Sequence, residues 1–212
     1  MRKQKFWQRH PGNWIVGMAV ALGSFVQAGC EEGGSEFAVS LQPFYSEVDL
    51  QSDPLLAGTW RDKEGDVSFT FEPSAEKEYK LVVIEKEGEK KTSGEFEGHL
   101  VRLGGNLFLD FFPKSIKEGG DFYRVHFVRG HSIARIEIGL DSSEMTFLSA
   151  SWLKRKIEEK SIDTPHEKVD GALLLTGTVE EVQDLVFLHA EEEGAFSEPL
   201  TLERQRVEEE IQ

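Results

Sequence analysis

The chain has a single cysteine among its 212 residues, Cys30, so it cannot form an internal disulfide. An exported domain of this kind must draw its stability from a packed core. Basic residues are also scarce: 24 Lys and Arg stand against 39 Asp and Glu, a net charge of −15. This balance argues against nucleic acid as a partner and against electrostatic adsorption to anionic lipid, because both require clustered positive charge. The acidic excess is typical of a soluble surface or of an acidic docking face.

The common signatures of catalysis are missing from the sequence. It contains no G-x-S-x-G nucleophile elbow and no glycine-rich phosphate loop followed by Lys and Ser or Thr. A zinc site formed by His126, His131 and Glu137 across a hairpin is one interpretation of its histidines. Ordinary strand histidines with hydrogen-bond partners are the other, and the one that we favour. We therefore expect no enzymatic activity, no metal and no cofactor.

Asp110 is the one carboxylate that stands out, because it interrupts the apolar run 107–112. Burial in such a strand would raise its pKa. The alternatives are that Asp110 faces water or that it pairs with an arginine such as Arg102.

No apolar run is long enough to indicate a membrane-spanning helix. The longest, 14–26, falls short of the roughly 18 residues that a confident span requires. It follows a basic start, with no acidic residue before position 31. A basic start, a short apolar run and small residues before a cleavage site are typical of a secretory signal. We predict a signal peptide at 1–29.

The end of that segment, Ala28-Gly29-Cys30, resembles the lipobox of bacterial lipoproteins, with Gln27 in place of the usual Leu. The resemblance implies that Cys30 is lipidated and that the chain is cut before it. It also implies a covalent lipid anchor in the bacterial cell envelope, facing the periplasm, with the outer membrane favoured over the inner. Cleavage would remove four basic residues and no acidic ones, leaving a net charge of −19.

Three further segments are predicted after the signal. Residues 30–54 are rich in Glu, Ser and Gly and indicate an acidic, flexible tether, on which Phe37, Phe44 and Tyr45 are candidates for docking on the domain. Residues 55–205 are expected to form a single β-rich domain. Residues 206–212 are expected to be a charged tail.

Period-two alternation of apolar residues predicts eight antiparallel strands in a meander that closes into a barrel. In the fourth, the apolar phase slips between Leu100 and Val101, which indicates a bulge. Gly104-Gly105-Asn106 is typical of a hairpin turn. The strands are expected at 58–61, 67–71, 79–85, 94–103, 107–112, 122–128, 131–138 and 145–148.

Two helices are predicted outside the barrel, at about 149–160 and 179–192. The second opens with Thr178 and Glu181, which fit a capping box. A last strand is an option at 199–202. The expected fold class is therefore mainly β with C-terminal helices.

Gly58 and Trp60 open the first of these strands and resemble the G-x-W start of lipocalin-like barrels. In that group the tryptophan plugs the closed end and an arginine from a late strand packs over it, a role that the resemblance assigns to Arg135. The layout is also similar to that of small uncharacterised bacterial lipoproteins.

Aromatic side chains recur along the predicted strands, and they either fill the barrel or line a ligand cavity. We expect a lipid-anchored, non-enzymatic envelope protein that binds a small hydrophobic ligand in its barrel. The alternative is a structural or interaction protein that has a packed barrel and an envelope protein as its partner. The candidate lining residues are Phe69, Phe71, Phe96, Phe108 and Phe127.

Overall fold

Alternating apolar residues and short turns fold the middle of the chain into consecutive antiparallel strands. The computed structural model describes residues 36–114, 128–169 and 172–206. Within them the meander comprises β3 (Gly58–Asp62), β4 (Val67–Ala75), β5 (Glu78–Glu87), β6 (Lys90–Leu103), β7 (Asn106–Pro113), β8 (His131–Ile138) and β9 (Ser142–Phe147). The predicted hairpin turn is confirmed: Leu103 pairs with Asn106, and Gly104 has a φ of +58°, which this two-residue turn requires.

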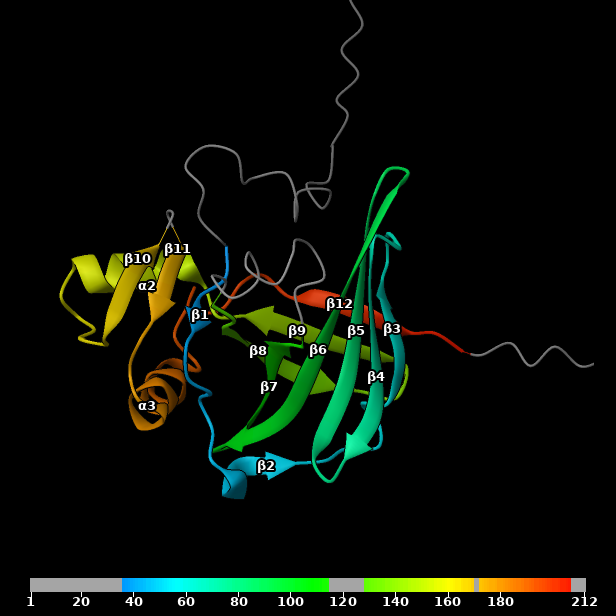
Figure 1. Ribbon diagram of the computed structural model, residues 1–212, viewed down its shortest axis with the longest axis horizontal. Helices are drawn as coiled ribbons and strands as arrows, with labels where there is room; N and C mark the ends of the chain where they lie inside the picture. Colours follow the sequence, from blue (N-terminus) through cyan, green and yellow to red (C-terminus); the bar gives the residue numbers. More distant parts are fainter. Residues whose placement is uncertain (1–35, 115–127, 170–171, 207–212) are drawn as a thin grey trace, which may run out of the picture.

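The eighth wall strand is β12 (Leu200–Arg204), which pairs with β3 on one side and with β9 on the other. Since β8 also pairs with β9, the sheet closes into an eight-stranded antiparallel barrel (Figure 1). The predicted number of wall strands is right, but one of the strands is a different segment from the one expected. The strand expected at 122–128 lies outside the described residues apart from Val128, and the strand optionally predicted at 199–202 completes the barrel instead. The helices are therefore inserted between the last two wall strands rather than appended after the barrel.

Residues 36–54 belong to the folded body. The short strand β1 (Val39–Ser40) pairs with β8 and, in parallel, with β11 (Ala172–Leu175), which continues to β10 (His166–Val169). After β1, the chain forms a 3₁₀ turn, η1 (Glu47–Asp49), and then β2 (Leu50–Gln51), which pairs with β6. Phe44, between β1 and η1, is fully buried. The flexible tether predicted through position 54 is thus wrong for this stretch, because its apolar residues cover an outer face of the barrel that would otherwise meet water.

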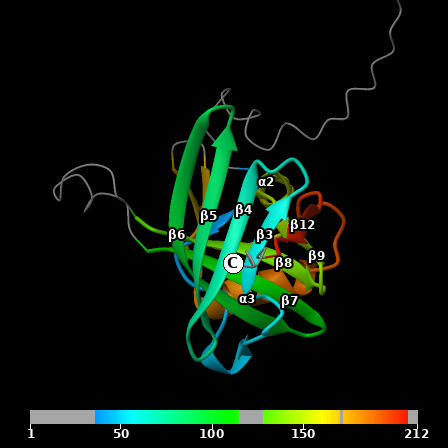
Figure 2. The ribbon, with the colours of Figure 1, turned by 90° about the vertical axis from the view of Figure 1, so that its right-hand side faces the viewer.

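Two helices lie on one side of the barrel, α2 (Ala150–Glu158) and α3 (Val179–His189), both shorter than predicted (Figures 1 and 2). The predicted capping box of α3 is confirmed: Thr178 accepts from the Glu181 amide, and Glu181 accepts from the Thr178 amide at 2.7 Å. Each helix buries one apolar stripe. No helix among the described residues is both long and apolar enough to cross a bilayer.

The wall of the barrel separates two hydrophobic cores. The interior core contains Leu100 and Leu109, and the outer core, between the wall and the helices, contains Val101 and Phe108. The register of β6 with β7 runs unbroken from Phe96 to Leu103. The predicted bulge at Leu100 is therefore wrong. Consecutive apolar residues occur there because both faces of the wall are buried.

Candidate functional site

Trp60 lies inside the barrel at the start of the wall and is 1% exposed. Its indole Nε1 donates to the Leu56 carbonyl at 2.9 Å. The guanidinium of Arg204, on β12, lies 4.2 Å from the centre of the indole ring and donates to the carbonyls of Leu55, Ala57 and Leu140. A Cβ at Gly58 would lie 3.1 Å from Arg204 Nη1, and its φ of +118° favours glycine. The two residues of the G-x-W pattern therefore have distinct roles. Gly58 leaves room for the Arg204 side chain, and that side chain covers Trp60.

Arg135, the residue assigned to cover Trp60, does something else, and that assignment is wrong. It is an outward-facing residue of β8, and its Nη1 donates to the Ala190 carbonyl at 2.9 Å, at the C-terminus of α3. Its guanidinium also lies 3.4 Å from Glu191 and over the ring of Phe196. A cation at a helix C-terminus compensates the unpaired carbonyls there. Arg135 thus fixes α3 to the barrel wall.

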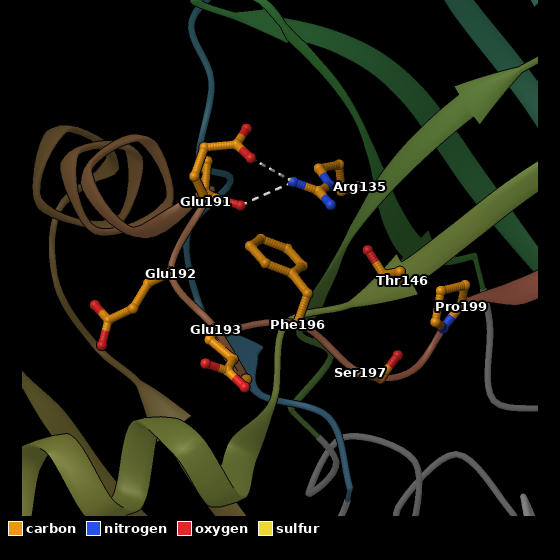
Figure 3. A pocket seen from close by; sticks show the side chains of 10 residues that line it. Arg135, Thr146, Glu191, Glu192, Glu193, Phe196, Ser197 and Pro199 are labelled. Atoms are coloured by element: carbon orange, nitrogen blue, oxygen red, sulfur yellow. Dashed lines mark hydrogen bonds and ion pairs between the residues drawn. The ribbon is translucent and has the colours of Figure 1, made fainter.

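A pocket of about 230 Å³ opens beside Arg135 (Figure 3). It is smaller than the roughly 300–1,000 Å³ typical of small-molecule sites, and Arg135 is already engaged by Ala190 and Glu191. Thr146 Oγ1 is buried there and has no hydrogen-bond partner among the described residues. The pocket is lined by Arg135, Thr146, Ala190, Glu191, Glu192, Glu193, Gly194, Phe196, Ser197 and Pro199.

The candidate ligand-lining phenylalanines divide between the two cores. Phe69 and Phe71 are buried in the interior core, and Phe96 packs against it while partly exposed. Phe108 is on the other face, in contact with Phe44 at a ring distance of 6.0 Å, so it cannot line the barrel interior. The last candidate, Phe127, lies outside the described residues. The interior aromatics contact one another, as Phe69 does with Phe111 and Phe71 with Tyr79.

Titratable side chains gather on the outer face of β5–β8. Glu97 and His99 are two residues apart on β6 and share a face, and His99 pairs with Asp110 of β7. Tyr79 of β5 points inward and pairs with Gly98, so Glu78 beside it faces outward with His99. We call this set the outer-wall cluster. Its members are Tyr45, Glu78, Glu97, His99, Asp110 and His131.

Asp110 is the buried centre of the outer-wall cluster, with 0% exposure. Its two carboxylate oxygens lie 2.7 and 3.0 Å from Nδ1 of His131, whose ring stacks on Phe112. Burial raises the pKa of the Asp110 carboxyl, and the hydrogen bond from His131 opposes that rise. Asp110 is thus buried, and the two alternatives, that it faces water or that it pairs with Arg102, are wrong. Arg102 donates to Gln51 instead, at 3.0 Å.

Tyr45 and His99 form the second hydrogen-bonded pair of the cluster. Tyr45 Oη lies 3.0 Å from Nδ1 of His99, and the two rings are 5.2 Å apart. Burial raises the pKa of Tyr45, and the charges of Asp110, Glu97 and Glu78 raise it further. Nε2 of His99 faces Oε1 of Glu97 at 3.8 Å. One ligand atom from each of Glu78, Glu97 and His99 lies within 4.8 Å of the other two.

The zinc interpretation made from the sequence involves other residues. Within the described residues, His131 is committed to Asp110, and Glu137 pairs in the β8–β9 ladder with Glu144. His126 and the lipidation candidate Cys30 lie outside the described residues. The sequence did not suggest Glu78, Glu97 and His99 as a site. The spacing Glu97-x-His99 on a strand nevertheless places these two side chains on one face. Glu78 and Tyr45 approach from other segments, and no local pattern indicates that.

The outer surface of α3 ends in two large apolar side chains, Phe187 at 53% exposure and Leu188 at 71%. The buried stripe of the same helix consists of Val182, Leu185 and Val186. Asp184 and Glu191 lie close to this pair in the sequence. The helix therefore presents an exposed apolar tip.

Comparisons of the chain with protein-family models, curated proteins and solved structures each found no significant match.

Proposed function

We propose that this protein is a lipid-anchored, non-enzymatic protein of the bacterial cell envelope, whose barrel is a packed scaffold and which binds a protein partner through its outer surface. The observation that carries the proposal is the packing on the two sides of the barrel wall. Side chains fill the interior, and the helices and residues 36–54 cover part of the outside. A barrel fold is compatible with a non-enzymatic protein. Partner contacts then belong to the surface.

Charge and apolar exposure favour α3 as the contact surface. Phe187 and Leu188 supply an apolar centre, and Asp184 and Glu191 lie close to them in the sequence. A partner that matches this surface carries basic residues around an apolar pocket. We expect such a protein in the same compartment.

Site-specific photo-crosslinking in intact membranes tests this interface. A crosslinker at position 188 is expected to give one discrete adduct, which high salt weakens because the contact is charge-complementary. The Phe187→Ser/Leu188→Ser variant, probed from position 184, is expected to lose it. A crosslinker at the exposed position 154 of α2 is the matched control. Absence of a discrete adduct at 188, or equal adducts at both positions, would overturn the interface.

The anchor is tested separately. Cys30→Ala is expected to abolish labelling by a fatty-acid analogue and to release the chain from membranes, since attachment then has no covalent basis. Ser35→Ala serves as the control. Membrane retention of Cys30→Ala at the level of the unchanged chain would exclude lipidation at this position.

A small hydrophobic ligand inside the barrel is the second candidate function, favoured by the aromatic composition of the interior. Binding there requires the interior side chains to separate, since ligand sites need roughly 300 Å³ or more. Native mass spectrometry of the protein purified from its own membranes distinguishes the two candidates. A stoichiometric lipophilic adduct, lost on Phe71→Trp, would favour the ligand. Its absence would favour the packed scaffold.

A further inference from the structure

Three members of the outer-wall cluster converge, with His99 Nε2 and Glu97 Oε1 3.8 Å apart. Glu97 and His99 come from β6 and Glu78 from the start of β5. All three are half-buried, so their ligand atoms are accessible without being freely mobile. We propose that Glu78, Glu97 and His99 bind a divalent transition-metal ion, with Zn²⁺ as the representative ion and water completing its coordination.

The distances suit such an ion after a small adjustment. The three ligand atoms lie within 4.8 Å of one another, so a central point is at most about 2.8 Å from each, whereas zinc–nitrogen and zinc–oxygen bonds are roughly 2.0–2.2 Å. Each ligand atom therefore has to move inward by less than about 1 Å. Glu side chains reach this by small torsional changes. The strand backbones need not move.

Tyr45 sets the orientation of the His99 ring. Its hydroxyl occupies Nδ1, so Nε2 is the nitrogen that faces Glu97. With Nδ1 protonated and donating to Tyr45 Oη, the lone pair of Nε2 is directed at the ion. A partner on the second ring nitrogen is the usual support of a metal-bound histidine. Tyr45 is thus a positioning residue rather than a ligand.

Local charge also favours a cation. Glu78 and Glu97 bring two carboxylates, and Asp110 lies behind His99 in the ladder. The nearest strand cation, Lys80, pairs with Glu97 in register, but its ammonium lies 3.7 Å from Glu72 on the other side. One imidazole with two carboxylates suits zinc or a neighbouring transition metal better than calcium or magnesium, which prefer oxygen ligands alone.

Calorimetric titration of the full chain with zinc chloride, in detergent and after removal of metal by a chelator, tests the site. We expect saturable binding that His99→Gln and Glu97→Gln each weaken by at least roughly tenfold, with a smaller loss for Tyr45→Phe, as for a second-shell partner. Two controls carry the same side-chain changes elsewhere. His166→Gln and Glu203→Gln, at a half-buried and an exposed position outside the site, are expected to leave the affinity unchanged.

Two further measurements keep the outcome decisive. Zinc is expected to raise the melting temperature of the unchanged chain but not of Glu97→Gln, since an ion bound only to the folded state stabilises it. The metal-free melting temperatures show whether each variant is folded. Equal zinc affinity in the unchanged chain and in both His99→Gln and Glu97→Gln, or no zinc binding at all, would overturn the proposal. A stronger response to calcium than to zinc would exclude the assigned metal class.

Discussion

The two sides of the barrel wall are built in different ways. The interior core draws almost entirely on the wall strands, whose alternate residues point inward. The outer core needs contributions from far along the chain, with Phe44 before the barrel and α2 and α3 inserted near its end. The interior core consists of apolar side chains, whereas the outer face also carries the outer-wall cluster. Chemistry available to a ligand or partner is therefore concentrated on the outside of this barrel.

The largest effect is expected from the interior. Trp60→Ala should lower the free energy of unfolding by about 3–5 kcal/mol, because it removes a fully buried indole and leaves a cavity. Urea unfolding measures the loss. Leu188→Ala, at an exposed position, should change stability by less than about 0.5 kcal/mol. A loss near zero for Trp60→Ala would remove this residue from the core.

The outer core is tested at the segment that was expected to be a tether. Phe44→Ala should cost about 3 kcal/mol, because the ring is fully buried against Phe108. Val48→Ala, four residues later and 87% exposed, is the control. If both substitutions leave unfolding by urea unchanged, residues 36–54 do not belong to the folded body.

Arg204 and Arg135 extend the comparison of the two sides of the wall, because Arg204 covers Trp60 of the interior and Arg135 holds α3 on the outside. Arg204→Ala should cost about 2 kcal/mol, because three carbonyls lose a charged donor and Trp60 loses its cover. Arg135→Ala should cost about 1 kcal/mol, since its side chain is 27% exposed and serves one helix end. Thermal and urea unfolding rank the pair. The reverse order would contradict the larger structural role of Arg204.

The smallest effect concerns pH. Because burial raises the pKa of Asp110, the folded chain binds this proton at a higher pH than the unfolded chain does. The resulting stabilisation is full below the unfolded pKa and is lost as pH rises through the folded pKa. Urea unfolding between about pH 4 and 7 should show this loss, and Asp110→Asn should diminish it. Asp163→Asn, at an exposed position, should leave the profile as it is. A profile identical in all three proteins would place Asp110 outside this linkage.

The barrel could be predicted from the sequence because its evidence is local. Val67, Phe69 and Phe71 alternate along β4, and Gly104-Gly105 specifies a hairpin whose register brings His99 opposite Asp110. The same reasoning from strand spacing and hairpin register could have located Glu97, His99 and Asp110, which are half of the outer-wall cluster. The capping box of α3 is likewise contained within four residues.

What could not be predicted depends on contacts between distant segments. Nothing near Arg204 in the sequence indicates that its side chain reaches Trp60. Arg135 is also an arginine on a wall strand, so residue type alone does not distinguish the two. Leu100 and Val101 suggested a bulge only because the cover over the outer face was unknown. The apolar character of Phe44 was visible, but not the surface that it would meet.

The position of β12 in the chain has a consequence for synthesis. Leu202 pairs with Asp62, so the wall cannot close until a segment 140 residues after β3 has been made. Until then β3 and β9 present unpaired edges, which are templates for pairing with other chains. Contacts of such long sequence separation form slowly. During synthesis the nascent protein thus exposes an open sheet with unpaired edges, and factors that hold unfolded chains would bind it in that interval.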